Sequence, residues 1–222
     1  MNKDKRLVFV HIPKTAGSSL NLFIYQNYSR DECILVSNPN ETPEINEHIK
    51  CILGHNLYGQ HQELGPCHYI TMFRDPVDRV ISNYFYLKDV LHYDHLGSLE
   101  EFAQSAERSN LQTRFVTGGQ ADLEQAIINM DQFTFYGITE MFKQSLFLLK
   151  EIMGWKNMNC PKVNVNTKKP TKELISKETI KKIEQANQLD IQLYQVAKKN
   201  FENRLQSLDH NMKIELQKWT RN

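Results

Sequence analysis

The first thirty residues constrain the fold more than any other part of this chain. Leu7–Val10 is a short run of β-branched, aliphatic and aromatic residues, which predicts a buried strand. A turn of small and polar residues follows from His11 to Gly17, and Ser18–Tyr28 then carries apolar residues at helical spacing. A strand, a small-residue loop and a helix in this order form the opening unit of a parallel α/β sheet.

The rest of the chain continues this alternation. Further strands are predicted at Cys33–Ser37, Cys51–Leu53, Tyr69–Phe73 and Phe133–Ile138. Helices are predicted to start at Pro76, Ser98 and Thr139, and to lie roughly at Lys177–Gln188 and Asp190–Leu205. The 222 residues show no repeat or low-complexity linker, so we expect one domain over 1–222, with a core at about 7–160 and a loop with C-terminal helices at about 161–222.

Composition narrows the possible partners. Hydrophobic residues make up 40% of the chain and charged residues 24%, so a buried core is feasible. The net charge is only +1, whereas a general binder of nucleic acid or another polyanion usually carries a stronger basic excess. An anionic ligand must therefore be held by a local cluster of donors.

Cysteine spacing and hydropathy suggest the compartment. None of the four cysteines forms a C-x-x-C pair, so a zinc site is poorly supported and reduced thiols are expected. No apolar run approaches the ~18 to 20 residues that cross a bilayer, and the charged N-terminus lacks a signal-peptide core. These features predict a cytoplasmic protein without a transmembrane segment.

The loop between the first strand and helix has the composition of an anion site. Small residues in Pro13–Ser19 allow a tight turn, and helix N–H groups carry the positive end of the dipole. Lys14 adds a charge, and Thr15, Ser18 and Ser19 add hydroxyl donors. The lysine precedes the glycine, so this is not the nucleoside-triphosphate pattern G-x-x-x-x-G-K-[ST]. The alternative is an ordinary strand-to-helix turn with a surface lysine.

A second candidate follows the strand at Tyr69–Phe73. Arg74 lies at its carboxyl end, the edge where open α/β sheets bind ligands. Ser82 lies two turns into the following helix, so both side chains can reach one phosphate. The alternative is a helix N-terminus with surface ion pairs, and we expect Arg79 to make such a pair.

Together the two segments resemble a known family. His11–Ser19 resembles the 5′-phosphosulfate loop, and Phe73–Ser82 the 3′-phosphate motif, of carbohydrate sulfotransferases that use 3′-phosphoadenosine 5′-phosphosulfate (PAPS), especially the heparan sulfate 2-O- and 6-O-sulfotransferases and bacterial relatives. The resemblance covers about Leu7–Leu205. It implies a three-layer parallel α/β fold related to P-loop nucleotide kinases, with a helical C-terminal region. The residues it assigns to PAPS and its product PAP are Lys14, Thr15, Ala16, Gly17, Ser18 and Ser19 on the 5′ side, and Arg74 and Ser82 on the 3′ side.

His55 is the candidate general base. It follows a short predicted strand in a Gly54–His55 context, where the resemblance places the catalytic histidine, and imidazole suits proton transfer near neutral pH. The alternative is a structural or solvent-facing histidine. His11 is the main competitor, but it precedes the loop and is expected to support it.

The resemblance also implies contacts later in the chain. It places Gln112 and Arg114 near the cofactor and acceptor, although Arg114 is equally compatible with an exposed helix position. Thr167, Lys168 and Lys169 correspond to a loop that closes over the nucleotide, with a solvated connector as the alternative.

These observations predict an O-sulfotransferase that moves a sulfuryl group from PAPS to a hydroxyl, on a glycan or glycolipid, without a metal. Lys14 is assigned a catalytic role on the leaving phosphate and His55 the base. A P-loop-type small-molecule kinase and a non-catalytic nucleotide- or glycan-binding relative remain as alternatives. Neither the acceptor nor the oligomeric state follows from the sequence.

Overall fold

A five-stranded parallel sheet organises the computed structural model, which describes residues 5–41, 43–156, 158–159 and 172–221. The strands lie in the order β2-β3-β1-β4-β5, and every neighbouring pair is parallel. Their bounds are β1 (Arg6–Val10), β2 (Cys33–Val36), β3 (Cys51–Gly54), β4 (Cys67–Phe73) and β5 (Phe135–Ile138). The predicted parallel α/β fold is therefore confirmed.

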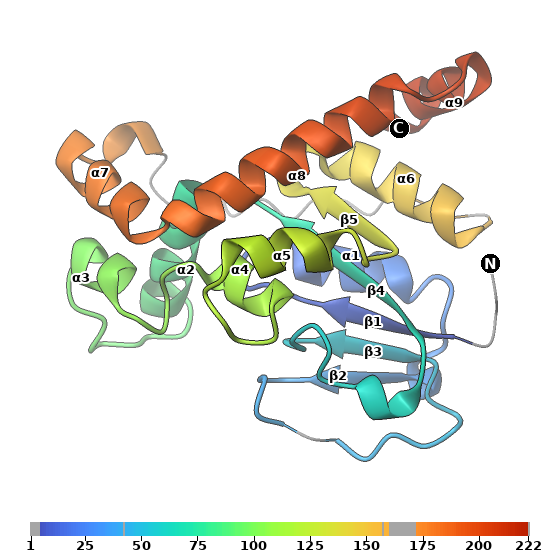
Figure 1. Cartoon of the computed structure of the whole chain (residues 1–222), viewed down its shortest axis with the longest axis horizontal. Coiled ribbons are helices and arrows are strands. Elements are labelled where there is room, and N and C mark those ends of the chain that lie inside the picture. The colour runs from blue at the N-terminus through green and yellow to red at the C-terminus, as the bar shows by residue number, and fades with distance from the viewer. Residues whose placement is uncertain (1–4, 42, 157, 160–171, 222) are drawn as a thin grey trace.

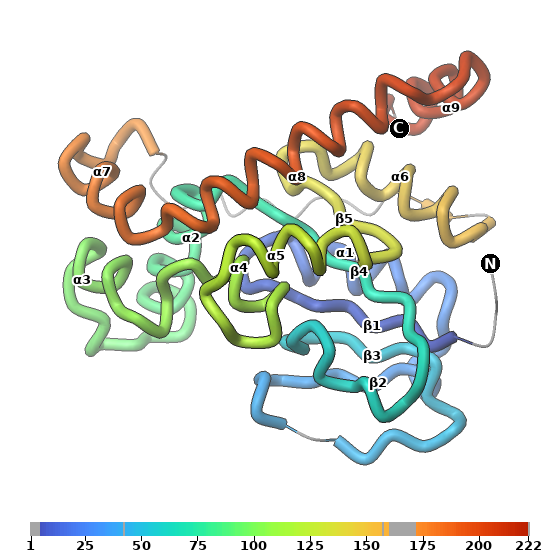
Figure 2. The backbone as a smooth tube through the Cα atoms, in the orientation of Figure 1, coloured from blue at the N-terminus to red at the C-terminus, as the bar shows by residue number. Residues whose placement is uncertain are grey.

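The order of the strands creates a ligand-binding position. β1 lies in the centre, with Val8 paired to Ile52 of β3 on one side and to Tyr69 of β4 on the other. From β1 the chain runs to β2 at one edge of the sheet, whereas from β4 it runs to β5 at the opposite edge, as the tube in Figure 2 shows. Loops that diverge at the carboxyl ends of neighbouring parallel strands leave a crevice where ligands bind. The loops after β1 and β4 are those with the predicted phosphate contacts.

Helices cover both faces of the sheet. Figure 1 shows α4 (Leu111–Val116) and α5 (Leu123–Met130) in front of it and α1 (Gly17–Ile24) behind it. The remaining helices are α2 (Pro76–Asp89), α3 (Leu99–Gln104), α6 (Phe142–Met153), α7 (Lys177–Ala186), α8 (Gln188–Gln206) and α9 (His210–Arg221). No helix in the described ranges is both long and apolar enough to cross a membrane.

Apolar clusters stabilise this arrangement, and two of them bear on the candidate site. The larger one joins the sheet to α1, α4, α5, α6 and α8, and includes the fully buried Phe9, Phe23 and Phe147. The smaller one packs α2 against α3 and α7 around Val80, Tyr84 and other buried side chains. The smaller cluster positions α2, which carries part of the candidate site.

Local signals at helix starts were accurate in two cases and wrong in one. Asp75 accepts a hydrogen bond from the Asp78 N–H with Pro76 at the first position of α2, and Ser98 forms the predicted capping box. Thr139 does not cap a helix as expected. It opens a short 3₁₀ turn, and α6 begins at Phe142.

Candidate active site at the carboxyl ends of the central strands

The loop between β1 and α1 has the backbone of an anion-binding turn. Lys14 (φ 70°) and Ala16 (φ 68°) are both left-handed, and Ala16 is the N-cap of α1 without a side-chain cap bond. Between them the Thr15 hydroxyl is fully buried and donates to the Ile12 carbonyl at 2.8 Å. This bond holds the turn closed, so the Thr15 hydroxyl acts within the loop, while the first N–H groups of α1 remain suited to an anion.

Lys14 is positioned by α2. Its Nζ lies 3.7 Å from the centre of the Tyr86 ring, a cation–π contact. The Lys14 carbonyl accepts a hydrogen bond from Nη1 of Arg74 at 3.0 Å. The two segments predicted to bind opposite ends of one nucleotide are therefore in direct contact.

Arg74 follows β4 and is held through its backbone. Its N–H donates to Oε1 of Gln112 at 3.0 Å, and its carbonyl accepts from Nε2 of Gln112 at 2.9 Å. Ser82 lies on α2 and is 8% exposed. Gln112 is fully buried by these contacts, so we reassign it from acceptor binding to the support of Arg74.

The expectation of a surface ion pair at Arg79 is wrong. Arg79 is 1% exposed, and its Nη2 lies 3.9 Å from Oδ2 of Asp190, which is also fully buried. A charged group out of water needs an opposite charge or hydrogen-bond partners, and α8 supplies the carboxylate here. Sequence spacing offered no signal for this pair, because its members are more than a hundred residues apart.

His55 follows β3, and its tautomer follows from its partner. Nδ1 lies 2.9 Å from the His11 carbonyl. A carbonyl only accepts hydrogen bonds, so Nδ1 carries a proton, and in the neutral ring the lone pair is on Nε2. The preceding Gly54 has φ 100°, and a Cβ there would lie 2.1 Å from the Val36 carbonyl oxygen. The sharp turn that orients His55 therefore requires glycine.

His11 is a neutral neighbour of the candidate base. Its ring stacks on the His55 ring at 4.6 Å and on the Phe9 ring at 5.2 Å. Burial, with smaller contributions from His55 and Lys14, lowers the pKa of His11 to about 3. His11 therefore contacts the candidate base through both its ring and its carbonyl.

The other predicted contacts lie further along the chain. Arg114 on α4 is half-buried, and its Nη1 approaches the Gly119 carbonyl at 3.4 Å. Its Nε is buried without a hydrogen-bond partner among the described residues. Thr167, Lys168 and Lys169 lie outside the described residues, so their assignment to the nucleotide stays a prediction.

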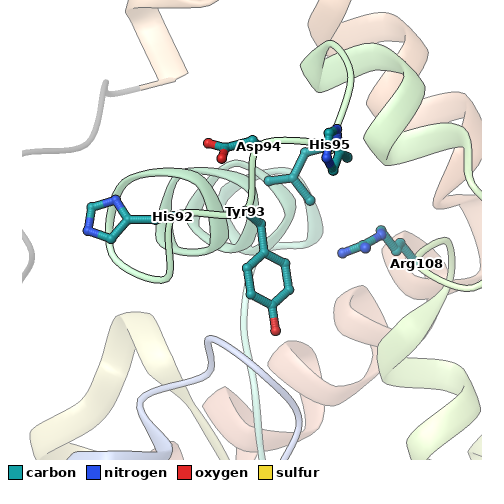
Figure 3. A pocket seen from close by; sticks show the side chains of 6 residues that line it. His92, Tyr93, Asp94, His95 and Arg108 are labelled. Carbon is teal, nitrogen blue, oxygen red and sulfur yellow. The ribbon is translucent and has the colours of Figure 1, made fainter.

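A surface hollow of about 360 Å³ lies beyond the C-terminal end of α2 (Figure 3). Its lining contains none of the predicted site residues and comprises His92, Tyr93, Asp94, His95, Leu96 and Arg108. The Arg108 guanidinium points toward the segment that carries Tyr93. In the described part of the chain, no group of three or more His, Cys, Asp or Glu side chains is placed to hold a metal ion.

Known proteins resemble this chain in sequence and structure. Residues 1–113 match the model of the Sulfotransferase family. Heparan-sulfate 6-O-sulfotransferase 1 of Homo sapiens is 24% identical, with 93% of this chain and 68% of the relative aligned, and that of Gallus gallus is 23% identical, with 89% and 66% aligned. The chain thus spans about two thirds of the length of these relatives. A crystal structure of mouse sulfotransferase SULT7A1 complexed with PAP has a TM-score of 0.43 at 15% identity, over 68% of this chain and 58% of that one. That likeness is too distant to place any residue.

Proposed function

Because this chain belongs to the sulfotransferase family, we propose that it transfers a sulfuryl group from PAPS to a hydroxyl of a carbohydrate. The convergence of three loops at one sheet edge is the observation that carries the proposal. The loops after β4 and β3 both contact the loop after β1: Arg74 donates to the Lys14 carbonyl, and His55 bonds to and stacks on His11. The names of the heparan-sulfate 6-O-sulfotransferases among its relatives favour a glycan acceptor.

The donor nucleotide is bound from both ends in this proposal. The Lys14 side chain and the N–H groups at the start of α1 bind the 5′ side, where the dipole of α1 favours negative charge. Arg74 and Ser82 bind the 3′-phosphate. The hydrogen bond from Arg74 to the Lys14 carbonyl holds the 5′-side loop and the 3′-side segment together in the absence of ligand.

His55 supplies the base. Its Nε2 accepts the proton of the acceptor hydroxyl while the hydroxyl oxygen forms a bond to sulfur and the bond from sulfur to the phosphate oxygen breaks. Lys14 and the N–H groups of the loop stabilise the negative charge that develops on the leaving phosphate, and PAP is released. The fixed Nδ1–carbonyl bond stabilises the imidazolium that forms, because Nδ1–H remains a donor throughout.

A comparison of His55→Ala with His48→Ala tests this assignment. His48 is an exposed histidine paired with Asp31 and serves as the matched control. With labelled PAPS and a panel of glycan, glycolipid and small hydroxyl acceptors, His55→Ala should lose about 10²- to 10⁴-fold in turnover, the usual contribution of a general base. PAP affinity should stay within about twofold, since the imidazole acts on the acceptor. Unchanged turnover would remove His55 from the mechanism.

Two outcomes would favour the alternatives. A larger thermal stabilisation by ATP with Mg²⁺ than by PAP would favour a small-molecule kinase. Stabilisation by PAP without sulfate transfer to any class of acceptor would favour a non-catalytic relative.

A further inference from the structure

Gln112 clamps the backbone of Arg74 from both sides. Its Oε1 accepts from the Arg74 N–H at 3.0 Å, and its Nε2 donates to the Arg74 carbonyl at 2.9 Å. The amide therefore replaces the pairing that a neighbouring strand would have given at the end of β4. With its backbone held, the Arg74 guanidinium keeps its place beside the Lys14 carbonyl.

Gln112 is in turn fixed by Asp190 of α8. The Asp190 carboxylate accepts from the N–H of Gln112 at 3.0 Å, and from the N–H and hydroxyl of Thr113, both at 2.8 Å. All three side chains are fully buried. A carboxylate with three donors at the N-terminal end of α4 is stabilised both by hydrogen bonds and by the helix dipole.

The two helices cap each other. Asn110 precedes α4 in the left-handed region and gives its own helix no side-chain cap. Its Oδ1 instead accepts from the N–H groups of Leu189 and Asp190 at the start of α8, while its N–H donates to Oδ1 of Asn187. α4 thus receives its cap from α8, and α8 receives its cap from the residue before α4. Among these contacts, the hydrogen bond from the Asp190 N–H to Oδ1 of Asn110 is the one that fixes Asp190 relative to α4, and Asn187 takes no part in it.

Arg79 extends the network to α2. Its guanidinium lies 3.9 Å from Asp190, and its Nε and Nη2 have no hydrogen-bond partner among the described residues. Its charge offsets that of Asp190, and it lies three residues before Ser82 on the same helix. Arg74 is therefore hydrogen-bonded to this buried network, and Arg79 links the network to α2, the helix that also carries Ser82.

We infer that Gln112 and Asp190 are positioning residues for the 3′-phosphate, and that they transmit the placement of α8 to the Arg74 guanidinium. The inference rests on the proposed function insofar as Arg74 binds that phosphate. Neither residue touches the nucleotide. Each acts by restricting the positions that Arg74 can occupy, so its removal should weaken recognition of the 3′-phosphate selectively.

The selective readout is the affinity ratio of two nucleotides. PAP and adenosine 5′-phosphate share the base, the ribose and the 5′-phosphate, and differ in the 3′-phosphate. Calorimetric titration of the full chain with each gives the ratio of their Kd values. Gln112→Met keeps the side-chain length and removes both hydrogen bonds to Arg74. It should reduce the ratio by about tenfold by weakening PAP, with adenosine 5′-phosphate changed by less than about twofold.

Asn187→Ala is the matched control. Asn187 is fully buried and belongs to the same reciprocal caps, but no hydrogen bond links it to Gln112 or Arg74. It should lower the thermal midpoint and leave the affinity ratio at the wild-type value. An equal fall of the ratio in Asn187→Ala and Gln112→Met would overturn the inference, because general loosening would then explain both.

Arg74→Ala separates this inference from the proposed function. If wild type discriminates the two nucleotides and Arg74→Ala abolishes the discrimination, the 3′-phosphate assignment stands, and an unchanged ratio in Gln112→Met refutes the positioning role alone. If Arg74→Ala leaves the ratio unchanged, the assignment of Arg74 fails and the positioning role fails with it. Asp190→Asn, which keeps an acceptor oxygen and loses the charge, should shift the ratio in the same direction as Gln112→Met. Gln112→Met decides the test if Asp190→Asn does not fold.

Discussion

Replacing Gly17 with alanine should damage the site through His11. A Cβ at Gly17 would lie 1.8 Å from Nε2 of His11, and 2.1 Å and 2.3 Å from two ring carbons. Ordinary van der Waals contact needs at least 3.4 Å, so the ring must move by more than an ångström. The His11 ring has little room to move, because the rings of Phe9 and His55 both stack on it. The displaced His11 should therefore disturb the candidate base.

Two opposing free energies decide the size of the effect. Gly17 is the first residue of α1, and alanine there should stabilise the helix by about 0.5–1 kcal/mol. Overpacking against a confined ring should cost about 3 kcal/mol, the upper part of the usual range for well-packed cores. The net loss is about 2 kcal/mol, which for a chain of this length corresponds to a fall of about 4–8 °C in Tm.

Thermal unfolding and turnover of Gly17→Ala, His11→Ala and the double variant test this reasoning. The clash disappears when the ring is absent, so the double variant should be more stable than the sum of the two single effects predicts, by about 2 kcal/mol or more. Turnover of Gly17→Ala should fall together with stability. A Gly17→Ala protein as stable as wild type, or additive effects in the double variant, would refute the assignment of the clash to His11.

Three further predictions concern the neighbourhood of the same loop. Burial lowers the pKa of His11 from 6.5 to about 3, so between these values the unfolded chain binds a proton that the folded chain does not. His11 should therefore make the free energy of unfolding fall as pH falls below about 6.5, by up to about 1.4 kcal/mol per pH unit. Urea unfolding of His11→Gln between pH 7 and 4.5 should show a free energy of unfolding that changes less steeply with pH than that of wild type. Parallel curves would contradict it. Thr15→Val removes the buried hydrogen bond to the Ile12 carbonyl and should cost about 1 kcal/mol of stability, seen as a Tm lower by about 2–4 °C. The control is Ser18→Ala, because Ser18 is an exposed residue of the same segment, and it should change Tm by less than about 2 °C. Tyr86→Leu removes the ring under Lys14 and should raise the KM for PAPS by about 2- to 5-fold, and an unchanged KM would show that the contact does not position the lysine.

Much of the framework was predictable because it depends on local pattern. The apolar run at Leu7–Val10 and the small-residue loop after it predict a central strand leading to a helix, and β1 and α1 form there. Asp75 and Pro76 mark the start of α2 by side-chain chemistry that acts within one turn. These signals involve residues close in sequence, so they do not depend on how the rest of the chain folds.

The partners of the candidate site residues were not predictable in this way. We expected a surface ion pair at Arg79 from its local context and a substrate contact at Gln112 from the family resemblance. Neither source of information shows which side chains the packing will bury. Asp190 contacts both residues only because α8 packs against α4 in the folded chain. Tyr86 lies under Lys14 only because α2 packs beside the loop.

By itself, the sequence determined where the predicted phosphate-binding loops lie along the chain, and that each of them follows a strand of one parallel sheet. Only the tertiary structure decided that His11 is a neutral support, that His55 keeps the lone pair on Nε2, and that a buried carboxylate from α8 is bonded to the residue that holds Arg74. The physical reason is that burial, tautomer and ion pairing depend on which groups meet after folding, and these groups come from segments tens of residues apart.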